Sequence, residues 1–148
     1  MSEHSAKISW TRGETDFAYE SYPRNHTWTF DNGVSIEASA AEGFLGDPAN
    51  VDPEEAFVAS LSSCHMLTFL AICAKKRMAV ESYEDAAVGY LEKNEDGALA
   101  VTRVELRPVI SFSGDAVSPE SLRELHEKAH HHCFIANSVK TEVVTVLD

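Results

Sequence analysis

The chain has 148 residues, of which 44% are hydrophobic and 24% charged, as expected for one soluble globular domain that needs no disulfides for stability. Twelve basic and 24 acidic residues give a net charge of −12. An acidic surface repels phosphate backbones, so we expect no nucleic-acid partner. The amino terminus lacks a secretory pattern, and three widely spaced cysteines do not resemble a secreted disulfide framework. We therefore expect a cytoplasmic protein.

The first third of the chain predicts short strands. Lys7–Trp10 is a short candidate, and His26–Phe30 is rich in residues that favour strands. The turn signal Asp31-Asn32-Gly33 and the alternating segment Val34–Ala38 predict a hairpin with the second of these strands. Residues 43–50 contain glycine, proline and asparagine and predict a loop.

The next segment, DPEEAFVASLSSCHMLTFL, predicts a long helix. Asp52 is a suitable N-cap, Pro53 a suitable first residue, and Glu54 and Glu55 suit the positive end of the helix dipole. The uncharged stretch 56–74 is long enough to cross a bilayer, but polar residues interrupt it and no aromatic belt flanks it. We therefore expect a buried core helix and no membrane partner.

The remaining elements complete an α+β pattern. Tyr83–Lys93 and Val101–Phe112 read as two long strands, and Pro108 indicates an edge or a bulge in the second. Ser118 opens a second helix, and Val139–Leu147 reads as the last strand. We predict a single domain over residues 1–148, with both helices on one side of a mostly antiparallel sheet. Because that sheet covers only one face of the apolar central helix, we also expect a homodimer.

The cysteines differ in their surroundings. Cys73 lies nine residues after Cys64, on the opposite helix face, and is expected to be ordinary packing. Three serines crowd the position before Cys64 and predict a helix break near Leu61-Ser62-Ser63. After such a break Cys64 would lie in the first turn of a second helix, where free N–H groups favour a thiolate, and Glu54 could approach it.

Two segments together carry a family resemblance. They are Asp52-Pro53-Glu54-Glu55, with Cys64 ten residues after the first Glu, and Cys133-Phe134-Ile135-Ala136-Asn137. Over residues 7–147 the chain resembles the OsmC/Ohr family of organic hydroperoxide reductases. The resemblance implies an intertwined homodimer with two active sites at its interface.

The resemblance also implies a chemistry that needs no cofactor and no metal. Cys64 would attack a hydroperoxide, release the alcohol and become a sulfenic acid. Cys133 would condense with it to a disulfide and expel water. A dithiol reductant, for which a lipoylated protein is one candidate, would then reduce the disulfide. An arginine held by Glu54 would assist, and Arg24, before a strand, fits the family position better than Arg12.

Some features depart from the better-known members or support rival interpretations. A histidine, His65, follows Cys64 where a phenylalanine is common, and Cys133 is followed by Phe-Ile-Ala instead of Pro-Val-Ser.

A cluster near the end of the second helix could hold a metal with help from Cys64 or Glu54. This cluster comprises His126, His130, His131, His132 and Cys133.

A third interpretation is a non-catalytic small-molecule binder that uses the dimer cleft. In either the enzyme or the binder, four phenylalanines are expected to line an apolar pocket. They are Phe44, Phe57, Phe69 and Phe134. A serine hydrolase is not expected, because the chain has no Gly-x-Ser-x-Gly motif.

Overall fold

The computed structural model describes residues 1–148, which divide into two compact units, Met1–Ala56 and Phe57–Asp148. The first unit holds a three-stranded antiparallel sheet in the order β1-β2-β3. The predicted hairpin between the second and third strands is confirmed, with Gly33 at a positive φ of 86° in its turn. The strands are β1 (Ala6–Ser9), β2 (His26–Phe30) and β3 (Ser35–Ala38). A short 3-10 helix, η1 (Glu42–Phe44), follows them.

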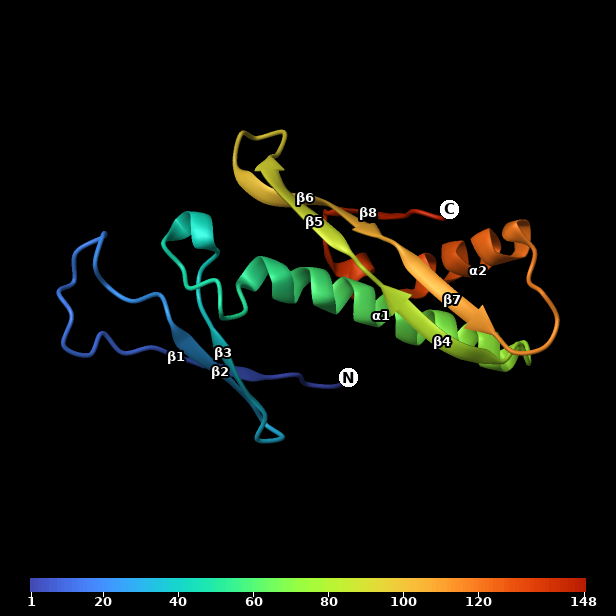
Figure 1. Cartoon of the computed structure of the whole chain (residues 1–148), viewed down its shortest axis with the longest axis horizontal. Helices are drawn as coiled ribbons and strands as arrows, with labels where there is room; N and C mark the ends of the chain where they lie inside the picture. The colour runs from blue at the N-terminus through green and yellow to red at the C-terminus, as the bar shows by residue number, and fades with distance from the viewer. The chain divides into compact units, whose positions relative to one another are not determined.

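The second unit holds two further sheets. Strand β4 pairs with β7, and β5 pairs with β6, which in turn pairs with β8 (Figure 1). All these pairs are antiparallel except β6–β8, which is parallel. The strands are β4 (Val80–Asp85), β5 (Val88–Lys93), β6 (Leu99–Leu106), β7 (Pro108–Phe112) and β8 (Glu142–Thr145). With two α-helices, this confirms the predicted α+β class and the mostly antiparallel sheets.

The prediction of two long, continuous strands was wrong. Each is divided in two, between β4 and β5 and between β6 and β7. Pro108 begins β7 and has no N–H for the ladder. Next to it, the N–H of Arg107 donates to the Asp85 carboxylate over 2.6 Å. This side-chain acceptor replaces a strand partner at the point where the ladder changes sheets.

Helix α1 (Pro53–Lys75) begins where the sequence predicts. The Asp52 carboxylate accepts the N–H of Glu55 over 2.8 Å, and the Glu55 carboxylate accepts the N–H of Asp52 over 3.1 Å. This reciprocal pair is a capping box. Arg77, two residues past the last helical residue, has a φ of 59°, a left-handed conformation typical of helix carboxyl ends.

The predicted break near Leu61-Ser62-Ser63 was wrong, because α1 is continuous from Pro53 to Lys75. The neighbouring hydroxyls bond within the helix or to a strand instead of capping a new one. Ser60 donates to the carbonyl of Phe57 over 2.7 Å, and Ser62 donates to the Asp85 carboxylate over 2.5 Å. A serine whose hydroxyl finds such an acceptor does not compete with the backbone ladder.

Helix α2 (Pro119–His132) also begins as predicted, with the Ser118 hydroxyl accepting the N–H of Ser121 over 3.1 Å. A short 3-10 helix, η2 (Ala136–Ser138), follows it. The face of α2 that carries Leu125 and Ala129 packs against Phe69 and Cys73 of α1. A second core cluster joins Leu61 to the strands and contains Val104 and Leu106.

One face of α1 is buried and the opposite face is exposed in the single chain. The buried residues recur every four positions: Leu61, His65, Phe69 and Cys73. On the other face Leu67 is 60% exposed, and its helical neighbours Ser63 and Ala71 are exposed too. By length and composition α1 is long and apolar enough to cross a membrane, a property that it shares with core helices of soluble proteins.

Candidate functional site: two thiols between α1 and α2

The structure brings Cys64 and Cys133 together. Cys64 lies in the middle of α1 and is partly buried, whereas Cys133 is the C-cap of α2 and only 1% exposed. The two thiols lie near enough for Cys64 to raise the pKa of the Cys133 thiol. Two segments far apart in the sequence thus form one dithiol site, and both cysteines are free.

The position of Cys133 is fixed by several backbone contacts. Its N–H donates to the carbonyl of His130 over 3.3 Å, and its carbonyl accepts the N–H of Asn137 over 3.0 Å. The N–H of Ala136 donates to its sulfur atom over 3.4 Å. Burial raises the pKa of the Cys133 thiol, and the neighbouring Cys64 thiol raises it further. Cys133 is therefore held in place and protonated at neutral pH in the reduced state.

Cys73 belongs to the hydrophobic core, as expected. It is 1% exposed and packs with Phe69, Leu125 and Ala129. Burial raises the pKa of its thiol, which keeps the group protonated and unreactive. The third cysteine is therefore packing and not part of the dithiol site.

The largest feature that sequence reasoning missed is a buried pair of imidazoles. Nε2 of His65 lies 2.9 Å from Nδ1 of His126, and the two rings are within 7° of parallel. The His126 ring also stacks on Phe69, with ring centroids 4.5 Å apart. A usable signal was present in the sequence, because His126 lies at helical spacing between the apolar residues Leu122 and Ala129.

The pKa of both imidazoles is lowered to about 4, chiefly by burial. For His65 the neighbouring imidazoles of His126 and His130 contribute to this lowering, and the Asp85 carboxylate opposes it. Both rings are therefore neutral at neutral pH. A neutral pair can share only one proton in the bond between Nε2 and Nδ1.

Arg24 and Glu54 are placed in the first unit. The Arg24 guanidinium lies 3.6 Å from the Tyr22 ring centroid and donates to the carbonyls of Tyr22 and Tyr19, over 2.5 and 2.6 Å. No ion pair joins Arg24 to Glu54, because both salt bridges of the chain involve Glu105. Arg12 is exposed, and its carbonyl accepts the Thr15 hydroxyl. The catalytic roles of Arg24 and Glu54 stay predictions.

Because α1 is continuous, it does not provide two contributions to the Cys64 site that the predicted break would have provided. Cys64 lies in mid-helix, so the free N–H groups of a helix amino terminus do not stabilise its thiolate, as the predicted break would have required. Along a continuous helix Glu54 lies ten residues, or ~15 Å, before Cys64. The Glu54 carboxylate therefore cannot reach the thiol through a kink in its own helix.

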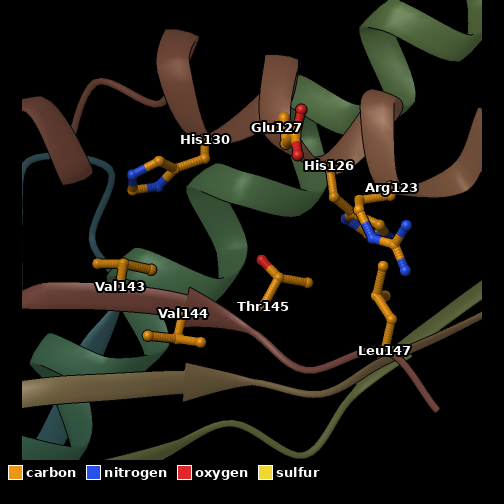
Figure 2. Close-up of a pocket in the computed structure, with 8 residues that line it drawn as sticks. All are labelled: Arg123, His126, Glu127, His130, Val143, Val144, Thr145 and Leu147. Atoms are coloured by element: carbon orange, nitrogen blue, oxygen red, sulfur yellow. The ribbon is translucent and has the colours of Figure 1, made fainter. Parts of the chain in front are cut away.

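The rival interpretation, a metal held by the histidine cluster, is not supported by the geometry. No group of three potential ligands gathers anywhere in the chain. His126 is bonded to His65, whereas His131 and His132 are exposed at the end of α2. His130 lines an open pocket of about 440 Å³ between α2 and β8 (Figure 2).

That pocket is not the expected apolar one. Its α2 side is polar and its β8 side is mostly aliphatic (Figure 2). Among the four phenylalanines, Phe69 is in the core and Phe57 packs against the second core cluster. Phe134 is 80% exposed, and Phe44 is exposed in the first unit. The lining consists of Arg123, His126, Glu127, His130, Val143, Val144, Thr145 and Leu147.

Comparison with known proteins agrees with this architecture. The model of the OsmC-like protein family matches residues 46–148. The solved structure of an OsmC-like protein of unknown function from Vibrio cholerae is 53% identical, with full coverage of both chains and a TM-score of 0.93. The chain therefore belongs to the OsmC-like family, which confirms the resemblance. None of the curated proteins matches it.

More distant solved structures share the fold. An organic hydroperoxide resistance protein from Elizabethkingia anophelis, with bound thiocyanate, is 22% identical with a TM-score of 0.74. The similarity covers 98% of this chain and 93% of that one. One from Legionella pneumophila is 16% identical with the same TM-score, and 98% and 94% of the two chains are covered. At these identities the similarity shows the fold alone.

Proposed function

We propose that this chain is a thiol-dependent peroxidase that reduces organic hydroperoxides to alcohols. The observation that carries the proposal is the pair Cys64 and Cys133, which α1 and the end of α2 place near each other. Cys64 is only partly buried in the single chain whereas Cys133 is buried, which favours Cys64 as the thiol that meets the substrate. Membership of the OsmC-like family and the organic hydroperoxide resistance proteins with the same fold support the substrate class.

The proposed cycle has three balanced steps. The Cys64 thiolate attacks the distal oxygen of the hydroperoxide and becomes a sulfenic acid, while the other oxygen leaves as the alcohol. The Cys133 thiol then displaces the hydroxyl of the sulfenic acid, which forms the disulfide and one water. A dithiol, for which a lipoylated protein is our candidate, reduces the disulfide and is itself oxidised. We place this cycle in the cytoplasm.

Arg24 and Glu54 complete the proposed site. A guanidinium stabilises a thiolate and donates to peroxide oxygens. Arg24 has only backbone carbonyls and tyrosine rings as partners in its own unit, so its positive charge is not neutralised by a carboxylate. We propose that Glu54 orients it during the reaction.

We further propose that the protein is an intertwined homodimer. The exposed face of α1 carries Ala59, Ser63, Leu67 and Ala71, and no charged residue interrupts it. A second copy of the chain would remove this apolar surface from water. In the folded chain, as expected from the sequence, one face of α1 therefore still needs a partner to cover it.

The deciding experiment oxidises the reduced protein with stoichiometric cumene hydroperoxide or hydrogen peroxide, and follows it by intact mass and disulfide mapping. We expect loss of two hydrogens, mapped to Cys64–Cys133, and faster reaction with the organic peroxide. Cys64→Ser should abolish the reaction, and Cys133→Ser should stop at one oxidation event per site. Cys73→Ser is the matched control and should react as the wild type does.

Two results would contradict the proposal. A Cys64→Ser variant with the wild-type peroxidase rate would remove the nucleophile from the mechanism. Absence of any reaction, or oxidation spread over all three cysteines, would leave the fold without this chemistry. A non-catalytic binder would then become the better explanation, with the pocket between α2 and β8 as its candidate ligand site.

A further inference from the structure

His65 and His126 form a buried bridge between the two helices that carry the thiols. Their nitrogens are 2.9 Å apart, and the residues are 1% and 2% exposed. His65 directly follows Cys64 on α1, and His126 lies seven residues, or two turns, before Cys133 on α2. One end of the bridge therefore adjoins Cys64, and the other lies on the helix that ends at Cys133, about 10 Å before it.

Packing alone does not account for this pair. Nδ1 of His65 and Nε2 of His126 are buried and have no hydrogen-bond partner. Unpartnered buried polar atoms are costly, and apolar residues of similar volume in place of a buried polar pair are often neutral or stabilising. What the imidazoles provide, and apolar side chains do not, is a directional bond. Such a bond fixes how two packed helices lie against each other, whereas the hydrophobic effect is non-directional.

The chemistry at Cys133 requires that kind of control. A disulfide forms only when the two Cα atoms are within about 4.4–6.8 Å and the Cβ vectors face each other. Cys133 is buried, and contacts with His130, Ala136 and Asn137 hold it at the end of α2. Because this thiol is not free to swing towards Cys64, the placement of α2 against α1 decides whether the bond can close.

We propose that His65 and His126 are positioning residues for disulfide formation. This inference rests on the proposed function. Their hydrogen bond holds α2 so that the Cys133 sulfur faces Cys64. When Cys64 is a sulfenic acid, the Cys133 sulfur then displaces its hydroxyl group, and one water leaves with the Cys133 proton. The bridge does not touch the peroxide, so the first oxidation is independent of it.

The test separates the two oxidative steps. Reduced protein is mixed with cumene hydroperoxide and quenched over time, and intact mass distinguishes the gain of one oxygen from the loss of two hydrogens. We expect His126→Leu to slow disulfide formation by about 10- to 100-fold, the effect of a displacement of about 1 Å, with formation of the sulfenic acid unchanged. His126→Asn keeps a polar atom near the Nδ1 position and should recover part of the rate, although its side chain is smaller.

The double variant His65→Leu/His126→Leu guards against a trivial folding defect. It leaves no orphaned nitrogen, so it should fold as stably as the wild type and still form the disulfide slowly. Wild-type rates of disulfide formation in both leucine variants would overturn the inference while the proposed function stands. Equal rates for His126→Asn and His126→Leu would also overturn it, because the lost polar atom would then not matter.

A second oxidant distinguishes failure of the inference from failure of the proposed function. Diamide, an azo-dicarboxamide, takes two hydrogens from a pair of thiols and closes a disulfide without any peroxide step. If the wild type ignores peroxides but diamide closes Cys64–Cys133 faster in the wild type than in His126→Leu, the proposed function fails and the positioning role stands. Equal closure by diamide in the two proteins would refute the positioning role.

Discussion

The buried imidazole pair should make the fold sensitive to mild acid. The pKa of each ring is lowered from 6.5 to about 4, so the native state keeps both rings neutral while the unfolded chain takes up protons below about pH 6.5. The free energy of unfolding should therefore fall as the pH drops from about 7 towards 4, and should not change above about pH 7. The Asp85 carboxylate opposes the effect at His65, and the imidazole of His130 adds to it.

The magnitude follows from proton linkage. For one ring with these two pKa values, the loss at pH 5 relative to pH 8 is about 2 kcal/mol. The pair should lose about 2–4 kcal/mol, because a first proton shared across the hydrogen bond changes the uptake of the second. This is a large part of the stability of an ordinary domain.

The assay is chemical unfolding at pH 8 and pH 5, at one protein concentration, for the wild type and His65→Leu/His126→Leu. Titrating groups elsewhere in the chain act in both proteins and cancel in the comparison. We expect the wild type to lose about 2–4 kcal/mol more than the double variant between the two pH values. Equal losses in the two proteins would refute the reasoning, because the neutral buried pair would then not be the acid-sensitive element.

Three further outcomes are expected from other parts of the chain. Phe69→Ala should lower the free energy of unfolding by about 3–5 kcal/mol, because Phe69 is fully buried against Tyr83 and His126. A loss below about 1 kcal/mol, measured by denaturant unfolding, would contradict this. Tyr22→Leu should slow the oxidation of Cys64 by about 2- to 30-fold, because it removes the ring that holds Arg24, whereas Tyr22→Phe keeps the ring and should react normally. Equal rates of Cys64 oxidation in these two variants would show that the Tyr22 ring does not contribute to the site. Leu67→Lys should yield monomers in size-exclusion chromatography with light scattering, and an unchanged dimer would place the interface elsewhere.

The sequence alone determined where the two helices begin and the amino-terminal hairpin. Asp52 and Ser118 satisfy backbone groups of their own first turns, and Asp31-Asn32-Gly33 joins two strands through a local turn. Such signals act over a few residues, so they can be recognised without knowing the rest of the fold. The segments around Cys64 and Cys133 were recognisable for a different reason, since their residue types and spacing resemble a family pattern.

Only the tertiary structure decided whether the serines before Cys64 break α1 and where the long strands divide. Both outcomes depend on Asp85, whose carboxylate accepts the Ser62 hydroxyl and the Arg107 N–H from two distant segments. Only the tertiary structure paired His65 with His126. From the sequence, a histidine in an apolar stretch can be a surface, core or ligand residue. Burying it is costly unless a hydrogen-bond partner is present, and the partner is not visible in the local sequence. That partner is brought by the packing of α2 on α1, which the sequence around either histidine does not encode.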